Sequence, residues 1–180
     1  MKSILVLMLV SSVLVACGSN SSEEGTKMTI QISSSAFAEG QSIPKKHSCE
    51  GTDVSPPLKW VNVPEGVKSL ALICDDPDAP MGTWVHWVLF NLPSETRELG
   101  ENVPKKPLLD NGARQGTTDF KRPGYGGPCP PPGKPHRYFF KLYALDTALD
   151  LKEGAAKKDV EKAMQGHILA QGQLMGTYKR

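Results

Sequence analysis

The chain has 180 residues, with 21 Lys and Arg against 19 Asp and Glu, giving a formal net charge of +2 at pH 7. Acidic and basic residues are interspersed along the whole sequence, so no broad positive field points to nucleic acid as a partner. This length is enough for one domain with one hydrophobic core.

The first segment has the features of an export signal. Met1-Lys2 is a basic start, and the apolar run that follows from Ile4 to Val10 is too short to span a bilayer. Leu14-Val15-Ala16-Cys17 then resembles the bacterial lipobox, whose cysteine is acylated and becomes the mature N-terminus. We therefore expect a signal peptide over residues 1–16, and the alternative is an ordinary signal peptide in which Cys17 is incidental.

Acylation of Cys17 would anchor the chain to a membrane, because each buried methylene contributes about 0.8 kcal/mol. The lipidated cysteine and a polar tether would occupy residues 17–26. Gly18, rather than an aspartate, follows the cysteine, which favours outer-membrane sorting in a cell with two membranes. The sequence thus predicts an exported, membrane-anchored lipoprotein, on the outer membrane and facing the periplasm if the organism is Gram-negative.

The remainder of the chain, residues 27–180, has the pattern of a single mostly β domain. Alternating apolar residues over 27–33 predict a first strand with one buried face. Runs rich in β-branched and aromatic residues predict further strands over 70–74, 84–92 and 138–145.

Prolines and glycines punctuate this β pattern. The 15 prolines and 17 glycines cluster in residues 55–66, 76–82 and 122–135. Long helices are excluded there, and the prediction is rigid loops that can hold a site.

The end of the chain departs from the β pattern. The apolar residues that recur there near helical spacing are Val160, Met164, Ile168 and Met175. This spacing predicts a C-terminal α-helix over residues 157–178, with Gly176 as its stop signal.

The first candidate site segment is Asp75-Asp76-Pro77-Asp78-Ala79-Pro80, which follows directly on an apolar strand. Carboxylates at a strand end are well placed for function when prolines fix the backbone around them. The alternative is an acidic turn, since Asp before Pro is common turn chemistry.

The second candidate is His86, in the strand predicted over 84–92. Regular alternation places its ring on the same face as Trp84, Val88 and Phe90. These neighbours predict a buried, hydrogen-bonded histidine, or a functional one if a carboxylate of the acidic segment lies within reach.

The third candidate is the proline-dense stretch over residues 125–138. Because proline donates no N–H, such a loop would form a rigid rim whose neighbouring N–H groups are free for a ligand. His136-Arg137-Tyr138 leads straight into an aromatic strand, which anchors the loop. A proline-rich surface loop or a polyproline ligand is the alternative.

Together these segments resemble the phosphatidylethanolamine-binding protein family, also called Raf kinase inhibitor proteins, and most closely its bacterial YbhB/YbcL branch. The pattern extends from Ile43-Pro44 to Gly176-Thr177-Tyr178. The resemblance implies a mainly β fold of two packed antiparallel sheets with Greek-key connections, plus the C-terminal α-helix. It also implies a small cavity at one end that holds phosphate, acetate or a phosphorylated headgroup.

The resemblance further implies which residues line this cavity. They are Asp76, Asp78, His86, Gly127, Pro128, Pro130, Pro131, His136 and Tyr138. The sequence departs from the eukaryotic pattern at several points. Val85-His86 stands in place of paired histidines, Cys129 interrupts the Gly-Pro-Pro run, and the C-terminal helix follows the bacterial form.

Aspartates that line an anion site need a protonated partner, since like charges repel. A carboxylate beside a histidine favours the charged imidazole, so we expect Asp76 or Asp78 to hold such a ring as a cation. That ring, from His86 or His136, would donate to the anion, with Tyr138 or loop N–H groups completing the shell. An ethanolamine ammonium could pair with the free carboxylate.

The predicted function is non-enzymatic binding of a small anion or phosphate-bearing headgroup in the cell envelope, with an unidentified protein as a further partner. The alternative is a hydrolase that uses the same Asp, His and Tyr groups for acid–base chemistry. No nucleophile elbow or Gly-rich phosphate loop supports it. We expect no cofactor, and no metal ion, because close His-x-x-x-His or Cys-x-x-Cys spacing is lacking.

Three cysteines would remain beside the lipidated one, so at most one pair can form within the domain. The resemblance places Cys49 and Cys129 in loops at one end of the fold, which makes a disulfide between them conceivable. Cys74, at a strand end, is expected to be buried.

Overall fold

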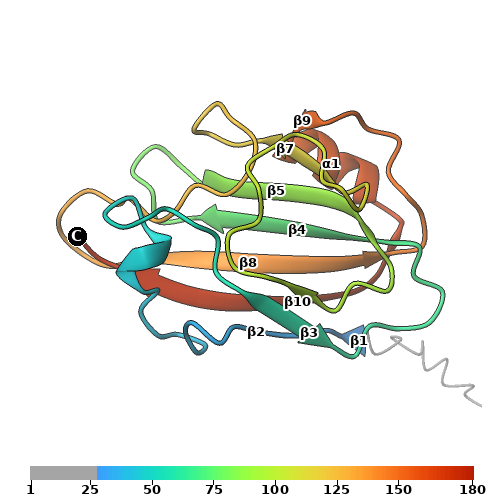
Figure 1. Cartoon of the computed structure of the whole chain (residues 1–180), viewed down its shortest axis with the longest axis horizontal. Helices are drawn as coiled ribbons and strands as arrows, with labels where there is room; N and C mark the ends of the chain where they lie inside the picture. Colours follow the sequence, from blue (N-terminus) through green and yellow to red (C-terminus); the bar gives the residue numbers. More distant parts are fainter. Residues whose placement is uncertain (1–27) are drawn as a thin grey trace, which may run out of the picture.

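The computed structural model describes residues 28–180, which form two β-sheets and a short α-helix (Figure 1). The signal peptide, the lipidation site and the tether predicted from the sequence lie outside the described residues. Within the described part, no helix is long and apolar enough to cross a membrane.

The larger sheet has seven strands in this part of the chain, in the order β1-β10-β8-β4-β5-β7-β9. In that order their bounds are Met28–Thr29, Ile168–Tyr178, His136–Leu145, Ser69–Asp76, Trp84–Pro93, Arg114–Thr117 and Gly154–Ala156. The strands pair antiparallel except for β1 with β10 and β7 with β9, which are parallel. The mainly β, two-sheet prediction is confirmed.

The smaller sheet is built, in order, from β2 (Gln31–Ser33), β3 (Leu58–Val61) and β6 (Glu98–Leu99). A 3₁₀ turn, η1 (Lys45–His47), precedes β3. The first predicted strand is therefore two strands in different sheets: β1 pairs with β10, β2 pairs with β3, and the chain crosses over at the buried Ile30.

Strand β4 lies in the middle of the larger sheet and is buried along its whole length. Leu70, Leu72 and Cys74 face the core shared with the smaller sheet. Ala71 and Ile73 face a second core that α1 (Lys157–Met164) covers. Burial on both faces explains the uninterrupted apolar run, and the prediction that Cys74 is buried is confirmed.

The C-terminal helix is confirmed only for its first part, because residues 168–178 form the long strand β10. The strand is buried with period two, at Ala170, Leu174 and Tyr178. Between them lie Gly172 and Gly176, where an added Cβ would meet the Ile30 carbonyl or the Ile43 and Phe37 side chains. Because glycines occupy inward-facing positions where apolar side chains would be expected, the alternation of the strand cannot be recognised by counting apolar residues. Gly176 lies within β10 and does not end a helix.

Strand β5 does not keep a regular alternation, because it contains a bulge. Cys74 pairs with Trp87 and Asp75 pairs with Val85, so His86 is an extra residue between them. Val88 and Phe90 face the core under α1, whereas the His86 ring packs edge-on against Tyr138, which belongs to the other core. The prediction that His86 shares a face with Val88 and Phe90 is therefore wrong.

Candidate ligand-binding site

A cavity of about 290 Å³ lies where β4 ends and where β5 and β8 begin, at the left of Figure 1. Its polar lining consists of Asp76, His86 and His136, and its other lining residues are Ala79, Pro80, Trp84, Phe120, Cys129 and Pro131. The structure thus brings the acidic segment, the strand with His86 and the proline-dense loop to one cavity.

Asp76 and His136 form a close pair at the edge of this cavity. Strands β4 and β8 are antiparallel neighbours, with Asp75 opposite Phe139, so Asp76 comes level with Tyr138. His136 precedes Tyr138 by two residues and therefore lies on the same face of β8, diagonally across from Asp76. The Nδ1 atom of His136 lies 2.8 Å from Oδ2 of Asp76, and both side chains are buried. The expected contact between a carboxylate and an imidazole is present, and no hydrogen bond within residues 28–180 uses Nε2 of this ring.

Asp78 makes a different contact from the one expected. Its carboxylate accepts hydrogen bonds from the Arg137 backbone N–H and from Nε and Nη2 of the same residue, at 2.7 to 2.9 Å. The side-chain bonds with Arg137 contribute most to lowering the pKa of Asp78 to about 2, and they outweigh the opposing effect of burial. Asp78 lines a neighbouring hollow with Lys134 and orients neither candidate imidazole.

His86 is held by a backbone carbonyl and not by a carboxylate. Its Nδ1 donates to the Gly126 carbonyl at 2.7 Å, and its ring packs edge-on between Phe120 and Tyr138. Burial lowers the pKa of His86, although the Gly126 carbonyl and Asp76 act in the opposite direction. This ring is therefore not the expected cation, and of the two histidines His136 has the geometry for that role.

Tyr138 packs edge-on against the His86 ring and is not one of the residues that line the cavity. Its hydroxyl is buried and has no hydrogen-bond partner among the described residues. Burial, and then the negative charge of Asp76, raises the pKa of Tyr138. The phenol thus remains protonated and available as a donor.

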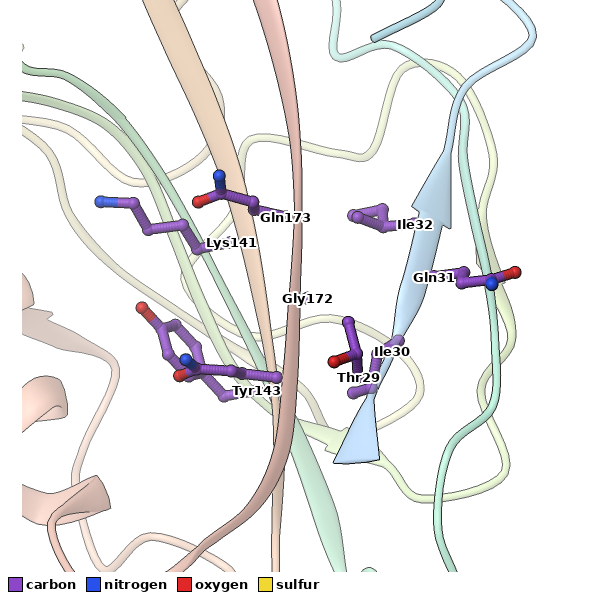
Figure 2. Close-up of a pocket in the computed structure, with 9 residues that line it drawn as sticks. Thr29, Ile30, Gln31, Ile32, Lys141, Tyr143, Gly172 and Gln173 are labelled. Carbon is purple, nitrogen blue, oxygen red and sulfur yellow. The ribbon is translucent and has the colours of Figure 1, made fainter. Parts of the chain in front are cut away.

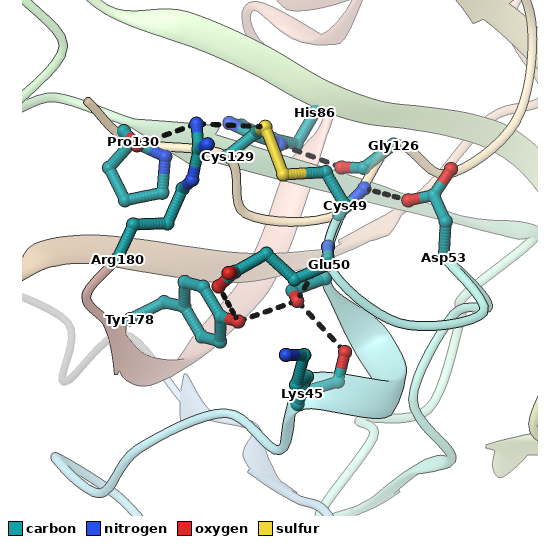
Figure 3. The surroundings of a disulfide bond; sticks show 12 residues. Lys45, Cys49, Glu50, Asp53, His86, Gly126, Cys129, Pro130, Tyr178 and Arg180 are labelled. Carbon is teal, nitrogen blue, oxygen red and sulfur yellow. Dashed lines mark hydrogen bonds between the residues drawn. A yellow bond between two sulfur atoms is a disulfide. The ribbon is translucent and has the colours of Figure 1, made fainter. Parts of the chain in front are cut away.

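The proline-dense loop is held in place through its own backbone. This corrects the expectation that N–H groups beside its prolines are free for a ligand, at least for Gly126 and Gly127 near its start. Gly126 N–H donates to the His86 carbonyl and Gly127 N–H to the Asp53 carboxylate. The Pro128 carbonyl accepts from Cys49 N–H, and Pro130 lies beside Arg180 (Figure 3). Of the predicted rim only Pro131 lines the cavity, while Gly127, Pro128 and Pro130 fix the loop.

A disulfide joins Cys49 to Cys129, whose Cα atoms are 5.4 Å apart, which is the pairing that the family resemblance makes conceivable (Figure 3). Cys129 lines the cavity, so the bond attaches one cavity wall to the segment that follows η1.

Asp53 is a site residue that sequence reasoning missed. Its carboxylate accepts from Gly127 N–H at 2.6 Å, from Lys105 Nζ at 2.7 Å and from Arg122 at 3.0 Å. Burial raises the pKa of Asp53, but these three donors outweigh it and the net shift is downward. No local signal could have revealed this role, because all three partners lie at least 52 residues away in the sequence.

Phe120 was also missed, and its position explains the shape of the cavity. It comes from the loop after β7 and contacts both Trp84 and His86 edge-on. Together with Pro131, these aromatic side chains make the cavity walls mostly apolar around three polar groups.

A larger hollow of about 650 Å³ lies beside the segment from Thr29 to Ile32. Figure 2 shows Lys141, Tyr143 and Gln173 at its edge, on β8 and β10. None of the predicted site residues lines it. Among residues 28–180, no group of three or more His, Cys, Asp and Glu side chains is placed to hold a metal ion.

Fold and site define a class of protein: a two-sheet β protein whose larger sheet ends in a small cavity with a carboxylate–imidazole pair. The family model described as "Phosphatidylethanolamine-binding protein" matches residues 33–179. The chain belongs to the phosphatidylethanolamine-binding protein family.

Relatives and solved structures agree with this assignment. The chain is 52% identical over 151 residues to a UPF0098 protein of Methanothermobacter thermautotrophicus, covering 84% of this chain and 99% of the relative. YbcL of E. coli, described as a new member of the mammalian PEBP family, has a TM-score of 0.79 and 34% identity over 84% of this chain and 98% of its own. A PEBP homolog from Chlamydia trachomatis has a TM-score of 0.77 and 43% identity, with the same coverage.

Proposed function

We propose that this protein is a non-catalytic binder of a small anion or a phosphate-bearing headgroup, held in the cavity at the end of the larger sheet. The observation that carries the proposal is the Asp76–His136 pair, buried at the cavity edge with the second ring nitrogen unused by the protein. A neutral amide side chain at the position of His136 could donate a hydrogen bond, but it could not offer a positive charge to an anion.

The pair supports anion binding through its proton. When a carboxylate holds Nδ1–H of an imidazole, the ring can carry a second proton on Nε2 while the carboxylate balances the charge. A hydrogen bond from a protonated imidazole to an anion is roughly twice as strong as one between neutral groups. His136 would supply this bond. The Tyr138 hydroxyl lies near the Asp76 carboxylate and stays protonated, because burial and then the charge of Asp76 raise its pKa.

The apolar walls favour an anion that carries an organic group. Trp84, Phe120 and Pro131 give the ligand contact area without competing for its charge. A cavity of about 290 Å³ is at the small end of the range for ligand pockets, which suits a headgroup and not a whole lipid.

The contacts of the site favour binding over hydrolysis. Cys129 is in a disulfide, so it offers no thiol nucleophile. Within residues 28–180 no serine or threonine hydroxyl is hydrogen-bonded to His86 or His136, so neither imidazole is paired with a hydroxyl nucleophile.

The proposal also covers where the protein acts and which branch of the family it represents. A chain exported by the signal at residues 1–16 and anchored through Cys17 would meet an oxidising compartment, where the Cys49–Cys129 disulfide persists. Similarity to YbcL supports the bacterial branch. An envelope protein that docks on the occupied cavity would be the protein partner.

Calorimetric titration of the purified protein with inorganic phosphate and phosphoethanolamine tests the proposal. We expect saturable binding that His136→Ala weakens by at least about tenfold, because the charged donor is lost. The matched control is His167→Ala, since His167 pairs with Asp146 at the same 2.8 Å but lies outside the cavity. Absence of binding, or equal losses in both variants, would contradict the proposal, as would turnover of ester or phosphomonoester substrates.

A further inference from the structure

The two imidazoles in the cavity differ in what their contacts allow them to do. A backbone carbonyl can only accept a hydrogen bond, so the 2.7 Å contact with Gly126 requires that His86 carries its proton on Nδ1. In the neutral ring, Nε2 then has a lone pair and is an acceptor. His136 contacts a carboxylate through Nδ1, and it donates from Nε2 when protonated.

The packing around His86 keeps this assignment in place. Phe120 and Tyr138 contact the ring edge-on, with centroids 5.3 and 5.1 Å away, and so hold the plane of the ring. A flipped ring would place Cδ2 against the Gly126 carbonyl and lose the 2.7 Å hydrogen bond, which selects the orientation described. Gly126 N–H also donates to the His86 carbonyl, so strand and loop are joined in both directions. Burial, which lowers the pKa of His86, further favours the neutral form.

Building on the anion-binding function proposed above, we infer that the cavity selects phosphate monoesters or free hydrogen phosphate over phosphodiesters. The P–OH group of a monoanionic phosphate would donate to Nε2 of His86. Its charged oxygen would accept from Nε2–H of His136. One donor and one acceptor on the protein thus match one acceptor and one donor on the ligand.

A phosphodiester lacks the group that this arrangement needs. All its phosphate oxygens are acceptors, so one of them would face the lone pair of His86 and leave a buried acceptor unpaired. Leaving a buried hydrogen-bonding group unsatisfied costs enough to weaken binding by roughly 10- to 100-fold. Sites built to bond a ligand hydroxyl reject analogues without it for the same reason.

The test compares methyl phosphate with dimethyl phosphate by calorimetry at pH 5.5. Both then carry mainly one negative charge, because the second pKa of a phosphomonoester is about 6. We expect methyl phosphate to bind roughly 10- to 100-fold more tightly. Inorganic phosphate is the third ligand: tighter binding than methyl phosphate identifies free phosphate as the ligand, and weaker binding identifies an ester whose organic group meets the apolar walls.

Two substitutions at His86 separate hydrogen bonding from packing. In His86→Gln the amide nitrogen can donate to the Gly126 carbonyl and the amide oxygen can accept in the cavity, so the preference for the monoester should remain. In His86→Phe no acceptor remains, and the ratio of the two affinities should fall to near one. Thermal melts of both variants show whether the fold is retained.

The outcomes distinguish this inference from the function on which it rests. Equal affinity of the parent protein for methyl and dimethyl phosphate would overturn the monoester preference and leave anion binding intact. If none of the three phosphates binds, the proposed function fails and the inference fails with it. A preference that survives in His86→Phe would also overturn the assignment to His86.

Discussion

Asp75 and Asp76 are neighbours on β4, yet they meet opposite surroundings. Asp75 points to the α1 side of the larger sheet, where Lys141 and Lys157 contact its carboxylate at 2.8 and 2.5 Å. Asp76 points to the cavity side, where His136 is its one ionic partner among the described residues and the Asp78 backbone N–H donates to its other oxygen at 2.8 Å. Because successive strand residues face opposite sides, one step along the chain separates the two environments.

The difference lies in the partners and not in the carboxylates. Lysine remains charged at neutral pH, so Asp75 is neutralised by the protein itself and serves the packing of α1 against the sheet. Histidine can gain or lose a proton near neutral pH, and His136 has a ring nitrogen that the protein leaves unused. Of these two buried ionic contacts, only the one on the cavity side can respond to a ligand.

The largest effect is expected from removing the covalent link on the cavity side. The Cys49–Cys129 disulfide spans a sequence separation of 80 residues, so the double variant Cys49→Ala/Cys129→Ala should lose about 4 kcal/mol of unfolding free energy. Urea denaturation with and without reductant measures this loss. A reduced parent as stable as the oxidised one would show that the bond does not hold this end together.

The next effect concerns the α1 side. Asp75→Ala leaves two lysines without their shared counter-charge, but Lys141 is partly exposed and Lys157 also contacts Glu161 at 3.5 Å. We therefore expect a loss of about 2 kcal/mol, below the value for a fully buried pair, with phosphate affinity unchanged. Urea denaturation and calorimetry on one preparation check both parts. If Asp75→Ala reduced phosphate affinity as much as the cavity-side variant Asp76→Asn, the contrast between the two faces of the sheet would be contradicted.

The cavity-side variant is Asp76→Asn, which keeps the size of the side chain and removes its charge. Without the carboxylate, protonated His136 loses its partner, so phosphate affinity should fall by about tenfold while unfolding free energy falls by only about 1 kcal/mol. The matched control is Asp78→Asn, which also removes a carboxylate near the cavity but one that pairs with Arg137. Equal losses of affinity in both variants would point to general electrostatics and not to the pair.

The smallest effect is a dependence of stability on pH through His86. Its folded pKa lies below the unfolded value of 6.5, so the unfolded chain binds the proton more readily. The stability that His86 contributes is present above pH 6.5 and is lost as pH falls from there towards the folded pKa. When the pH is lowered from 7 to 5.5, the unfolding free energy of the parent should fall by up to about 1 kcal/mol more than that of His86→Gln. Urea denaturation at each pH measures this difference. Identical slopes in the two proteins would contradict the lowered pKa.

The sequence predicted those parts of the site that local patterns encode. Asp76, His86 and His136 lie at strand ends flanked by proline or aromatic residues, and their segments carry the family resemblance. Asp53 and Phe120 show no such pattern, because their roles arise from contacts with residues far away in the chain.

The errors about the fold have equally specific causes. Period-two arguments fail at a bulge, which is why the face of His86 was misjudged. Apolar counting fails where close packing demands glycine, as at Gly172 and Gly176 of β10. The two-sheet architecture depends on several longer apolar runs, such as β4, and was therefore predicted correctly.

The most direct test of the central claim is a proton–nitrogen correlation spectrum of the histidine rings during a phosphate titration. The account predicts that ring nitrogens of His86 and His136 shift together and saturate, with His136 Nε2 moving towards the protonated form and His86 Nε2 remaining an unprotonated acceptor. His167 should not respond, since its pair with Asp146 lies outside the cavity. Rings of His86 and His136 that stay unchanged at saturating phosphate would contradict the claim that this cavity binds the anion.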